Sequence, residues 1–260
     1  MLAQHVRLTA LGALLVFDAG TGAPVTAKYR VDQTLTQEID ATAAGKGKQS
    51  LSFSTSSFLT LTLTDSVGGK AVRVVVDSMR ADSTAPIPST VFDSARGAEY
   101  HGFLSAAGRL SELEIVSSSA AAAQVQGFLV DFFPWVKAGV KVGERWADTT
   151  ARTTASGTDS VVVKRIVAYQ ATGNETRNAR KAVRIASQYS SNVLGTQPTP
   201  NGPAKIEGTG TGTGIYFVSP DGSYLGGDWQ LQSALKISGS FANDPLPINI
   251  TQTTKVTALK

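Results

Sequence analysis

Residues Ser117–Trp135 have the sequence SSSAAAAQVQGFLVDFFPW and decide our prediction of the fold, because they form the strongest helix candidate in a chain that is otherwise rich in predicted strands. Their apolar side chains recur at the spacing of one helical face, namely Ala121, Val125, Phe128, Leu129 and Phe132. The alanine run favours helix formation. A serine at the start can cap the helix, and Pro134 ends it. We therefore predict an amphipathic helix over residues 117–134.

The segments before this helix show the two-residue alternation of β-strands. Between Leu59 and Thr64, leucine and threonine alternate strictly, which predicts a sheet with one buried face. The predicted strands in this part are Ala27–Ile39, Gln49–Thr64, Val72–Met79, Glu99–Leu104 and Arg109–Val116. Ala81–Ala98 contains two prolines and no periodicity, so we predict a surface loop there.

Strands resume after the helix and continue to the end of the chain. The predicted strands are Glu144–Thr154, Ser160–Gln170, Ala182–Val193, Ile206–Val218, Ser223–Ser238 and Ile248–Leu259. Turns are predicted at Thr172–Asn174 and Pro220–Gly222, and a loop or linker at Gly195–Pro203.

The order of strands, one helix and further strands differs from the alternation that builds a parallel sheet. It predicts a mainly β fold, a large curved antiparallel sheet that forms an open or half barrel with one central amphipathic helix. Residues 24–260 are then a single β-rich domain, in which strand sets 24–116 and 144–260 are joined by the helix at 117–134. Two smaller β lobes with the helix at their joint are the alternative arrangement.

Composition and the first residues bear on the compartment. The 260 residues have a formal net charge of +4 and no cysteine, which excludes disulfides, thiol catalysis and cysteine-ligated metals. Met1–Phe17 has one cation, Arg7, followed by an apolar stretch, and small residues follow up to Ala23. Residues 1–23 are thus a candidate secretory signal, and an ordinary first strand is the alternative. On the first interpretation we expect a periplasmic, extracellular or cell-envelope protein of a bacterium.

Glu207–Gly214, EGTGTGTG, looks at first like a phosphate-binding loop. Such a loop must open a helix, whereas Ile215–Val218 that follows is strand-like. In a strand the glycines, including Gly210 and Gly212, share one face and leave a groove. We expect the Phe128–Phe132 side of the helix, or a bound apolar molecule, to fill that groove.

Candidate catalytic residues are few. The two histidines, His5 and His101, do not form a zinc-binding pair, so we expect no metal site and no cofactor. Glu112 and Glu114 share a face of a strand and could do acid–base chemistry, but a solvated face is the favoured interpretation. The cluster Arg177–Arg184 lacks the aromatic side chains of a nucleic-acid platform, so we expect a solvated turn and no nucleic-acid partner.

Large aromatic side chains gather around the predicted helix and are candidates for the lining of a ligand site or an interface. Together with their neighbours, the candidate site residues are Phe128, Leu129, Phe132, Phe133, Trp135, Trp146, Gly210 and Gly212. A purely structural role in the core is the alternative for the aromatic residues.

Val136–Trp146, VKAGVKVGERW, together with Tyr29-Arg30 near the first strand, resembles a family of uncharacterised secreted or envelope β-rich bacterial proteins. In outline the chain is also similar to the lipoprotein-carrier half-barrels. That resemblance implies a curved antiparallel sheet that holds apolar ligands, with helical segments closing its mouth.

These observations favour a non-enzymatic envelope protein that binds an apolar ligand or lipid in a cleft between sheet and helix, without a transmembrane span. The alternative is a structural or accessory subunit that docks on a larger envelope assembly. A hydrolase that uses Glu112, Glu114 or His101 is the third hypothesis.

Overall fold

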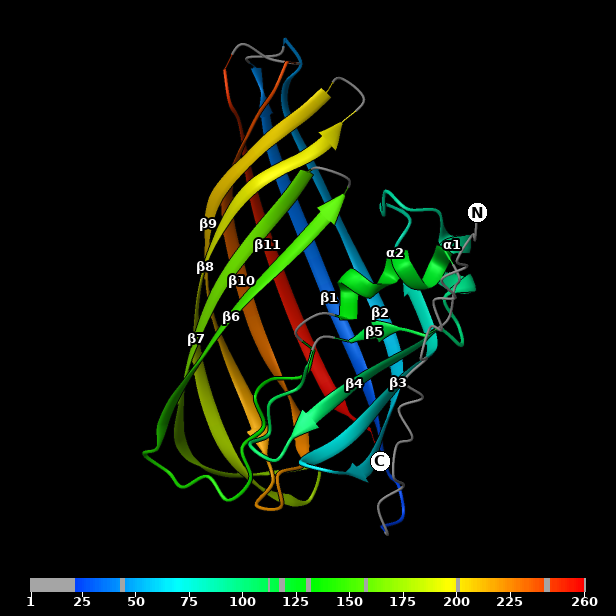
Figure 1. Ribbon diagram of the computed structural model, residues 1–260, viewed down its shortest axis with the longest axis vertical. Coiled ribbons are helices and arrows are strands. Elements are labelled where there is room, and N and C mark those ends of the chain that lie inside the picture. Colours follow the sequence, from blue (N-terminus) through cyan, green and yellow to red (C-terminus); the bar gives the residue numbers. More distant parts are fainter. Residues whose placement is uncertain are drawn as a thin grey trace, which may run out of the picture.

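The computed structural model describes residues 22–42, 45–111, 113–116, 120–129, 132–156, 159–199, 202–240 and 244–259. These residues form one strongly curved sheet of eleven strands, and two short helices lie against one half of it (Figure 1). Every pairing between neighbouring strands is antiparallel. The prediction of a mainly β fold built on a large antiparallel sheet is confirmed.

The elements follow one another as a meander. Before the second helix they are β1 (Val25–Ala41), β2 (Gly47–Ser66), β3 (Gly69–Ala81), α1 (Ser89–Ser94), β4 (Glu99–Ser105) and β5 (Glu114–Ile115). Then come α2 (Ala120–Leu129), β6 (Arg145–Ser156), β7 (Asp159–Arg177), β8 (Arg180–Thr199), β9 (Gly202–Val218), β10 (Tyr224–Ser238) and β11 (Leu246–Ala258). The spatial order is β5-β4-β3-β2-β1-β11-β10-β9-β8-β7-β6.

The first and last strands of the domain join the two predicted strand sets. β1 pairs with β11 from Tyr29↔Ala258 to Ile39↔Ile248, and with β2 on its other side. The chain therefore builds one continuous sheet, and the alternative of two separate lobes is wrong. The sheet is open, because β5 and β6 stand at opposite ends of the strand order.

The two edges of the open sheet approach each other. The segment between β4 and β5 carries Arg109, and β6 carries Asp148. Nη2 of Arg109 lies 2.7 Å from Oδ1 of Asp148. We call this junction the seam. It bridges two edges that are not joined by backbone hydrogen bonds in the sheet order of the described strands.

Three predictions around the helices are wrong in extent. The predicted helix over 117–134 is realised only as Ala120–Leu129, which stops well before Pro134. The predicted loop Ala81–Ala98 contains α1, whose Phe92 is buried in the core. Six residues are too few to show a helical period, so the sequence gives no sign of α1. The predicted strand Arg109–Val116 shrinks to the two residues of β5, with an isolated bridge between Leu104 and Leu110.

Two predicted breaks lie inside or between long strands. Thr172–Asn174 belongs to β7, where the register against β8 shifts between Ala171 and Gly173. The glycine there marks a bulge and not a turn. The actual turn is at Asn178 and Ala179, both with positive φ. Gly195–Pro203 is also mostly strand, since β8 continues to Thr199 and β9 begins at Gly202.

Residues 1–21 of the candidate secretory signal lie outside the described residues. Within the described part of the chain, none of the helices has the length and apolar character needed to cross a bilayer.

Candidate ligand cleft

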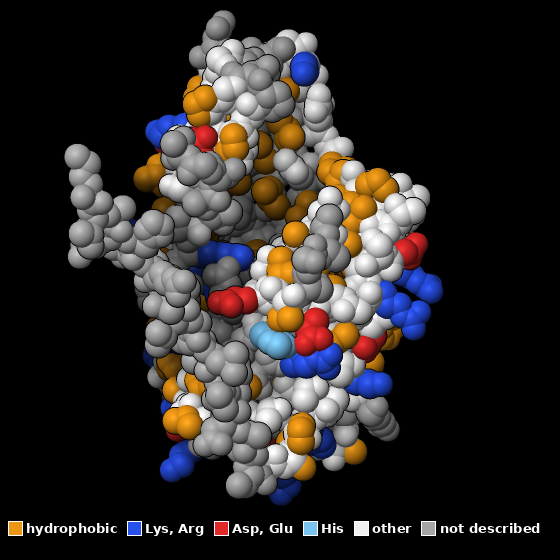
Figure 2. Space-filling model, turned by 45° about the vertical axis from the view of Figure 1, so that its right-hand side comes forward, with side chains coloured by type: hydrophobic (Ala, Val, Ile, Leu, Met, Phe, Trp, Pro, Cys, Tyr) orange, Lys and Arg blue, Asp and Glu red, His pale blue; other side chains and the backbone are white. Residues whose placement is uncertain are grey.

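The concave face of the sheet is divided into two halves along the strands. Toward the β7–β8 and β9–β10 turns the inward side chains are buried, and we call this the filled half: Tyr29, Tyr169, Ile185, Tyr216, Tyr224 and Val256. Toward the opposite ends of the strands several inward side chains are only half-buried, and we call this the open half: Leu35, Val163, Tyr189, Leu231, Ser233 and Ile250. Other inward side chains of this half are buried, for example Phe53, Ile206 and Ile248. Figure 2 shows a hollow with hydrophobic side chains in its depth.

Helix α2 is fixed near the boundary between the halves. The hydroxyl of Tyr100 in β4 donates a hydrogen bond of 2.7 Å to the carbonyl oxygen of Ala122. Burial raises the pKa of Tyr100 to about 12, because the charged phenolate would be desolvated. Val125 and Leu129 of α2 are buried in the main core. The helix is therefore held on the β3–β4 side of the sheet, and not at its centre.

The segment after α2 closes the filled half with an aromatic cluster. Phe132 packs edge-to-face on Tyr29 at a centroid distance of 6.2 Å, and Phe133 packs on Tyr224 at 5.2 Å. Tyr29 and Tyr224 are stacked at 5.7 Å, and the Tyr29 hydroxyl donates to the carbonyl oxygen of Tyr224. Burial raises the pKa of both tyrosines above the ordinary value. Such packing leaves little free space in this half.

A cleft of about 480 Å³ lies where the open half meets the seam, and we call it the seam cleft. One wall is formed by Arg109, Leu110, Ser111 and Leu113 beside β5, the opposite wall by β6 to β8, and the base by α2 with the following aromatic residues. The lining residues are Arg109, Leu110, Ser111, Leu113, Gln126, Leu129, Phe132, Phe133, Thr150, Ala151, Arg152, Val163, Arg165 and Tyr189. The size is within the range of about 300–1,000 Å³ that is typical of ligand sites.

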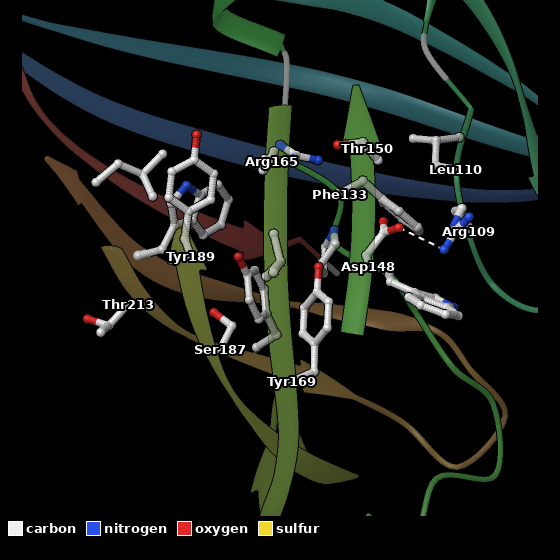
Figure 3. Close-up of a pocket in the computed structure, with 16 residues that line it drawn as sticks. Arg109, Leu110, Phe133, Asp148, Thr150, Arg165, Tyr169, Ser187, Tyr189 and Thr213 are labelled. Atoms are coloured by element: carbon white, nitrogen blue, oxygen red, sulfur yellow. Dashed lines mark ion pairs between the residues drawn. The ribbon is translucent and has the colours of Figure 1, made fainter. Parts of the chain in front are cut away.

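The bottom of the seam cleft narrows into a small extension of about 80 Å³ beside the ion pair of the seam (Figure 3). Asp148 is 9% exposed and Arg109 is 48% exposed, so the pair joins a buried carboxylate to a guanidinium at the surface. The contact is close but lacks hydrogen-bond geometry at Oδ1 of Asp148. The Arg109 guanidinium also lies over the ring of Trp135, with Cζ 4.7 Å from the centroid. The seam is thus held mainly by charge and stacking.

Two further arginines of the seam cleft, Arg152 and Arg165, extend from neighbouring strands and each interacts within the chain. With Tyr189, Thr150 and Gln126 they give the cleft a polar side opposite its apolar base of Leu129 and Phe132. Such a mixed lining suits a molecule with an apolar body and a polar end.

A second cavity, of about 340 Å³, lies on the other side of α2, and we call it the helix cavity. It is lined by Gln33, Leu35, Phe53, Thr55, Ile87, Gln124, Gly127, Phe128 and Gln252. These residues come from β1, β2, β11, α2 and the segment before α1. Helix α2 thus separates two cavities of the open half.

The predicted site residues divide between these places. Leu129, Phe132 and Phe133 line the seam cleft, and Phe128 lines the helix cavity. Trp135 lines the narrow extension, where its Nε1 donates 2.6 Å to the carbonyl oxygen of Ala107. That these residues bind a ligand stays a prediction.

Trp146 lies apart from the residues that line the cleft. It stacks on Tyr169 at a centroid distance of 5.4 Å with nearly parallel rings, and Lys137 Nζ lies 5.7 Å from its ring centroid. Its indole Nε1 is buried and has no hydrogen-bond partner among the described residues. Trp146 therefore contributes to the aromatic packing of the filled half.

The glycines of β9 face the concave side, as the strand interpretation requires. Gly210 pairs between Ser191 of β8 and Ser233 of β10, and the atoms nearest to an added Cβ are their hydroxyl oxygens at 2.5 and 2.9 Å. At Gly212 they are a backbone oxygen and the Leu231 side chain, at 2.4 and 2.5 Å. Atoms of the neighbouring strands therefore occupy the space that side chains at these glycine positions would need.

Our prediction that the Phe128–Phe132 side of the helix fills this glycine face is wrong. Phe128 packs against Phe53 of β2 and Phe92 of α1, with ring centroids 6.3 and 5.9 Å apart, and Phe132 packs on Tyr29 of β1. Hydrogen bonding of Tyr100 to α2 holds the helix on that side of the sheet. The alternative occupant, a bound apolar molecule, stays a prediction.

The candidate catalytic residues do not form a site in the described part of the chain. His101 is exposed, and its Nε2 lies 2.8 Å from Oε1 of Glu99. The pKa of Glu99 is lowered to about 2, chiefly by a hydrogen bond from Arg73. Glu114 is exposed in β5, while Glu112 lies outside the described residues. Among the residues described, no group of three or more His, Cys, Asp and Glu side chains could hold a metal ion.

The basic cluster Arg177–Arg184 surrounds the β7–β8 turn on the outside of the filled half. Arg177 Cζ lies 3.8 Å from the Phe217 ring centroid, and Arg180 pairs with Asp221 at 3.3 Å. These local contacts fit the favoured interpretation of a solvated turn.

Several residues around the cavities were not singled out by the sequence. Arg109 and Asp148 are 39 positions apart in numbering, and only the curvature of the sheet brings them together. Inward positions such as Arg165 and Tyr189 follow from strand alternation once the register is known. Gln33 and Thr55 are polar residues at buried positions of β1 and β2. Polar residues at the inward positions of an alternating strand are unusual, and this pattern could have identified them from the sequence.

Comparisons with known proteins do not show a family for this chain. No protein-family model matches this chain, and a search of curated proteins finds no match in sequence.

Proposed function

We propose that this protein is a non-enzymatic binding protein of the bacterial envelope, which holds a lipid or another apolar ligand in the seam cleft. The observation that supports this most is the half-buried state of inward apolar side chains around a space of about 480 Å³. Water in contact with apolar surface costs roughly 25 cal/mol per Å². An apolar ligand that fills the cleft removes this cost, because it covers the apolar surface. A protein that binds no ligand would remove the same cost by packing its side chains into the cleft.

The arrangement of the cleft suits entry and retention. Its two walls are the opposite edges of the open sheet, so that a ligand reaches the interior at the seam without passing through a strand pairing. The half-buried side chains of Leu110, Leu113 and Val163 offer apolar surface to a ligand, whereas Leu129 and Phe132 are at most 2% exposed and belong to the core beside it. The polar side of the cleft can contact a headgroup or solvent.

The envelope location is supported by sequence features alone. The candidate signal at residues 1–23 and the outline similarity to lipoprotein-carrier half-barrels both fit a periplasmic or extracellular role. The curved open sheet with a helix beside its concave face is the architecture that this similarity implies.

The experiment that tests this function is organic extraction of the purified full chain, followed by mass spectrometry. We compare the wild type with Val163→Trp, which places an indole in the seam cleft, and with Val162→Trp, which places one on the outer face of the same strand. We expect one class of apolar molecule at near-stoichiometric amounts in the wild type and in V162W, and a loss of at least tenfold in V163W. Extracts without such a molecule, or equal amounts in both variants, would contradict the proposal.

One observation favours a second function, that of an accessory subunit in an envelope assembly. β6, Arg145–Ser156, is a twelve-residue strand at the edge of the sheet. Long edge strands offer backbone groups for pairing with another chain. A purified chain without extractable ligand that forms a stoichiometric complex with one envelope protein, protected at the β6 amides from hydrogen exchange, would favour this function.

A further inference from the structure

The helix cavity holds two polar atoms that the fold leaves without a hydrogen bond. Oε1 of Gln33 and Oγ1 of Thr55 are buried and have no partner in the described part of the chain. The two residues are cross-strand partners in β1 and β2, and are 6% and 4% exposed. Both line the helix cavity. Buried polar groups are nearly always satisfied, so an adjacent pair beside an empty space requires an explanation.

The rest of the cavity defines what could satisfy these atoms. Leu35, Phe53, Ile87 and Phe128 form apolar walls, and Gln124 lies toward the entrance. No charged side chain is present among the residues described as lining it. An ion placed here would lack a countercharge, and burial of an unpaired ion is strongly unfavourable. The lining therefore selects a neutral molecule.

The polar atoms at the base can adjust to such a molecule. The terminal torsion of a glutamine side chain is broad, so Gln33 can present its amide oxygen or nitrogen to the cavity. A threonine hydroxyl both donates and accepts. Gln252, the remaining amide of the base, already donates to Thr254 at 3.3 Å.

We propose that the helix cavity is a second binding site, which takes a neutral molecule with an apolar body and a terminal hydrogen-bonding group such as a hydroxyl. The hydroxyl lies against Gln33 and Thr55, and the hydrocarbon lies between the apolar walls under α2. This site is independent of the proposed function, since α2 separates it from the seam cleft.

Gly127 provides a direct way to block the site. It lines the cavity, and an added Cβ meets no atom within 4 Å. Leucine is a better helix former than glycine, so Gly127→Leu keeps or raises the stability of α2 while its side chain occupies the cavity. The matched control is Ala123→Leu, on the same helix at an exposed position outside the cavity lining.

The probe is 1-hexanol, titrated into the full chain and followed by NMR, with hexanoate as the charged probe of the same length. We expect saturable binding of 1-hexanol and at least tenfold weaker binding of hexanoate. G127L should weaken 1-hexanol binding at least tenfold, with A123L and V163W within twofold of the wild type. Thr55→Val should weaken it about threefold without lowering Tm, because the variant removes an unsatisfied buried hydroxyl.

Four results would overturn the proposal. They are the absence of saturable 1-hexanol binding, equal binding by G127L and A123L, equal binding of hexanoate, and an unchanged affinity in T55V combined with Gln33→Leu. The last result would mean that 1-hexanol binds in the cavity through apolar contacts alone, without a hydrogen bond to Gln33 or Thr55. A melting curve for each variant shows that lost binding does not come from unfolding.

Discussion

The filled and open halves of the concave face belong to the same strands but differ in what covers them. In the filled half, Tyr29 and Tyr224 meet aromatic residues that follow α2, Tyr216 packs on Tyr224, and each tyrosine is at most 8% exposed. In the open half, Leu231 and Tyr189 point to the same side of the sheet and stay half-buried beside the narrow extension of the seam cleft. One alternating pattern therefore produces a core at one end and a cavity at the other.

The difference is encoded in the size of the inward side chains as well as in their cover. Along β8 the small inward residues Ser187 and Ser191 lie on either side of Tyr189, and along β9 the inward residues change from Tyr216 to Gly214 and the other glycines. Small residues keep the sheet tightly paired but give no bulk to the interior. The hollow is thus a property of the strands themselves.

The sharpest test of the comparison removes equal bulk from each half. Leu59→Ala truncates a side chain that is 0% exposed and should destabilise the fold by about 3 kcal/mol. Leu231→Ala truncates a half-buried residue of the open half and should cost about 1 kcal/mol or less. Denaturant unfolding of both variants measures the difference. Equal costs would mean that the open half is as closely packed as the filled half.

Adding bulk to the glycine face should also destabilise the fold. A Cβ at Gly212 would lie 2.4 Å from the Gln230 carbonyl oxygen, so Gly212→Ala should cost about 2 kcal/mol through overpacking. Gly210→Ala should cost less, because the serine hydroxyls around it can rotate. Gly173→Ala in β7 has no atom within 4 Å and is the control. Wild-type stability of both G210A and G212A would refute the close approach at β9.

The hydrogen bond between β4 and α2 ties the helix to the sheet. Tyr100→Phe removes it and should cost about 1 kcal/mol at neutral pH. The pKa of Tyr100 in the folded state is raised to about 12. The contribution of Tyr100 to the free energy of unfolding is therefore fully present below the unfolded-state pKa near 10, and it is lost as the pH rises toward 12. Unfolding between pH 9 and 12 should show a shallower loss in Y100F than in the wild type. Parallel curves would show that Tyr100 is not protected.

The seam should respond least in stability and most in ligand exchange. Arg109→Met removes the partner of the buried Asp148, but the exposure of Arg109 screens the pair, so we expect a cost of about 1 kcal/mol. The wider seam should raise the rate of ligand release severalfold. Stopped-flow displacement measures it, and Lys205→Met at an exposed pair on β9 is the control. An unchanged release rate would show that ligands do not pass the seam.

Most of the fold can be predicted from the sequence, because strict alternation of apolar and polar residues predicts both a strand and the face of that strand that is buried. Leu59 and Leu61 are buried as their pattern predicts. The turn at Pro220–Gly222 is also confirmed, by the hydrogen bond from Gly222 N–H to the Ser219 carbonyl. Composition and period together were sufficient to predict an open antiparallel sheet, but they predicted one central helix, whereas the described residues form two short helices against one half of the sheet.

The site was only partly predictable, because its parts depend on long-range geometry. The aromatic residues after α2 were recognised as candidates, but their partner was wrongly placed on β9. That position depends on the Tyr100–Ala122 hydrogen bond, which no local pattern reveals. The seam joins Arg109 and Asp148 only after eleven strands have curled. α1 was missed because six residues are too few for a helical period.

If the open half of the concave face is binding space, a neutral apolar probe should bind there and should be displaced when both cavities are filled. The neutral probe N-phenyl-1-naphthylamine, whose emission rises in apolar surroundings, is titrated into two delipidated double variants. V163W/G127L fills both cavities, and V162W/A123L adds the same side chains outside them. We predict saturable binding in V162W/A123L and at least tenfold weaker binding in V163W/G127L, a difference of about 1.4 kcal/mol or more. Equal affinities in the two folded variants would contradict the account.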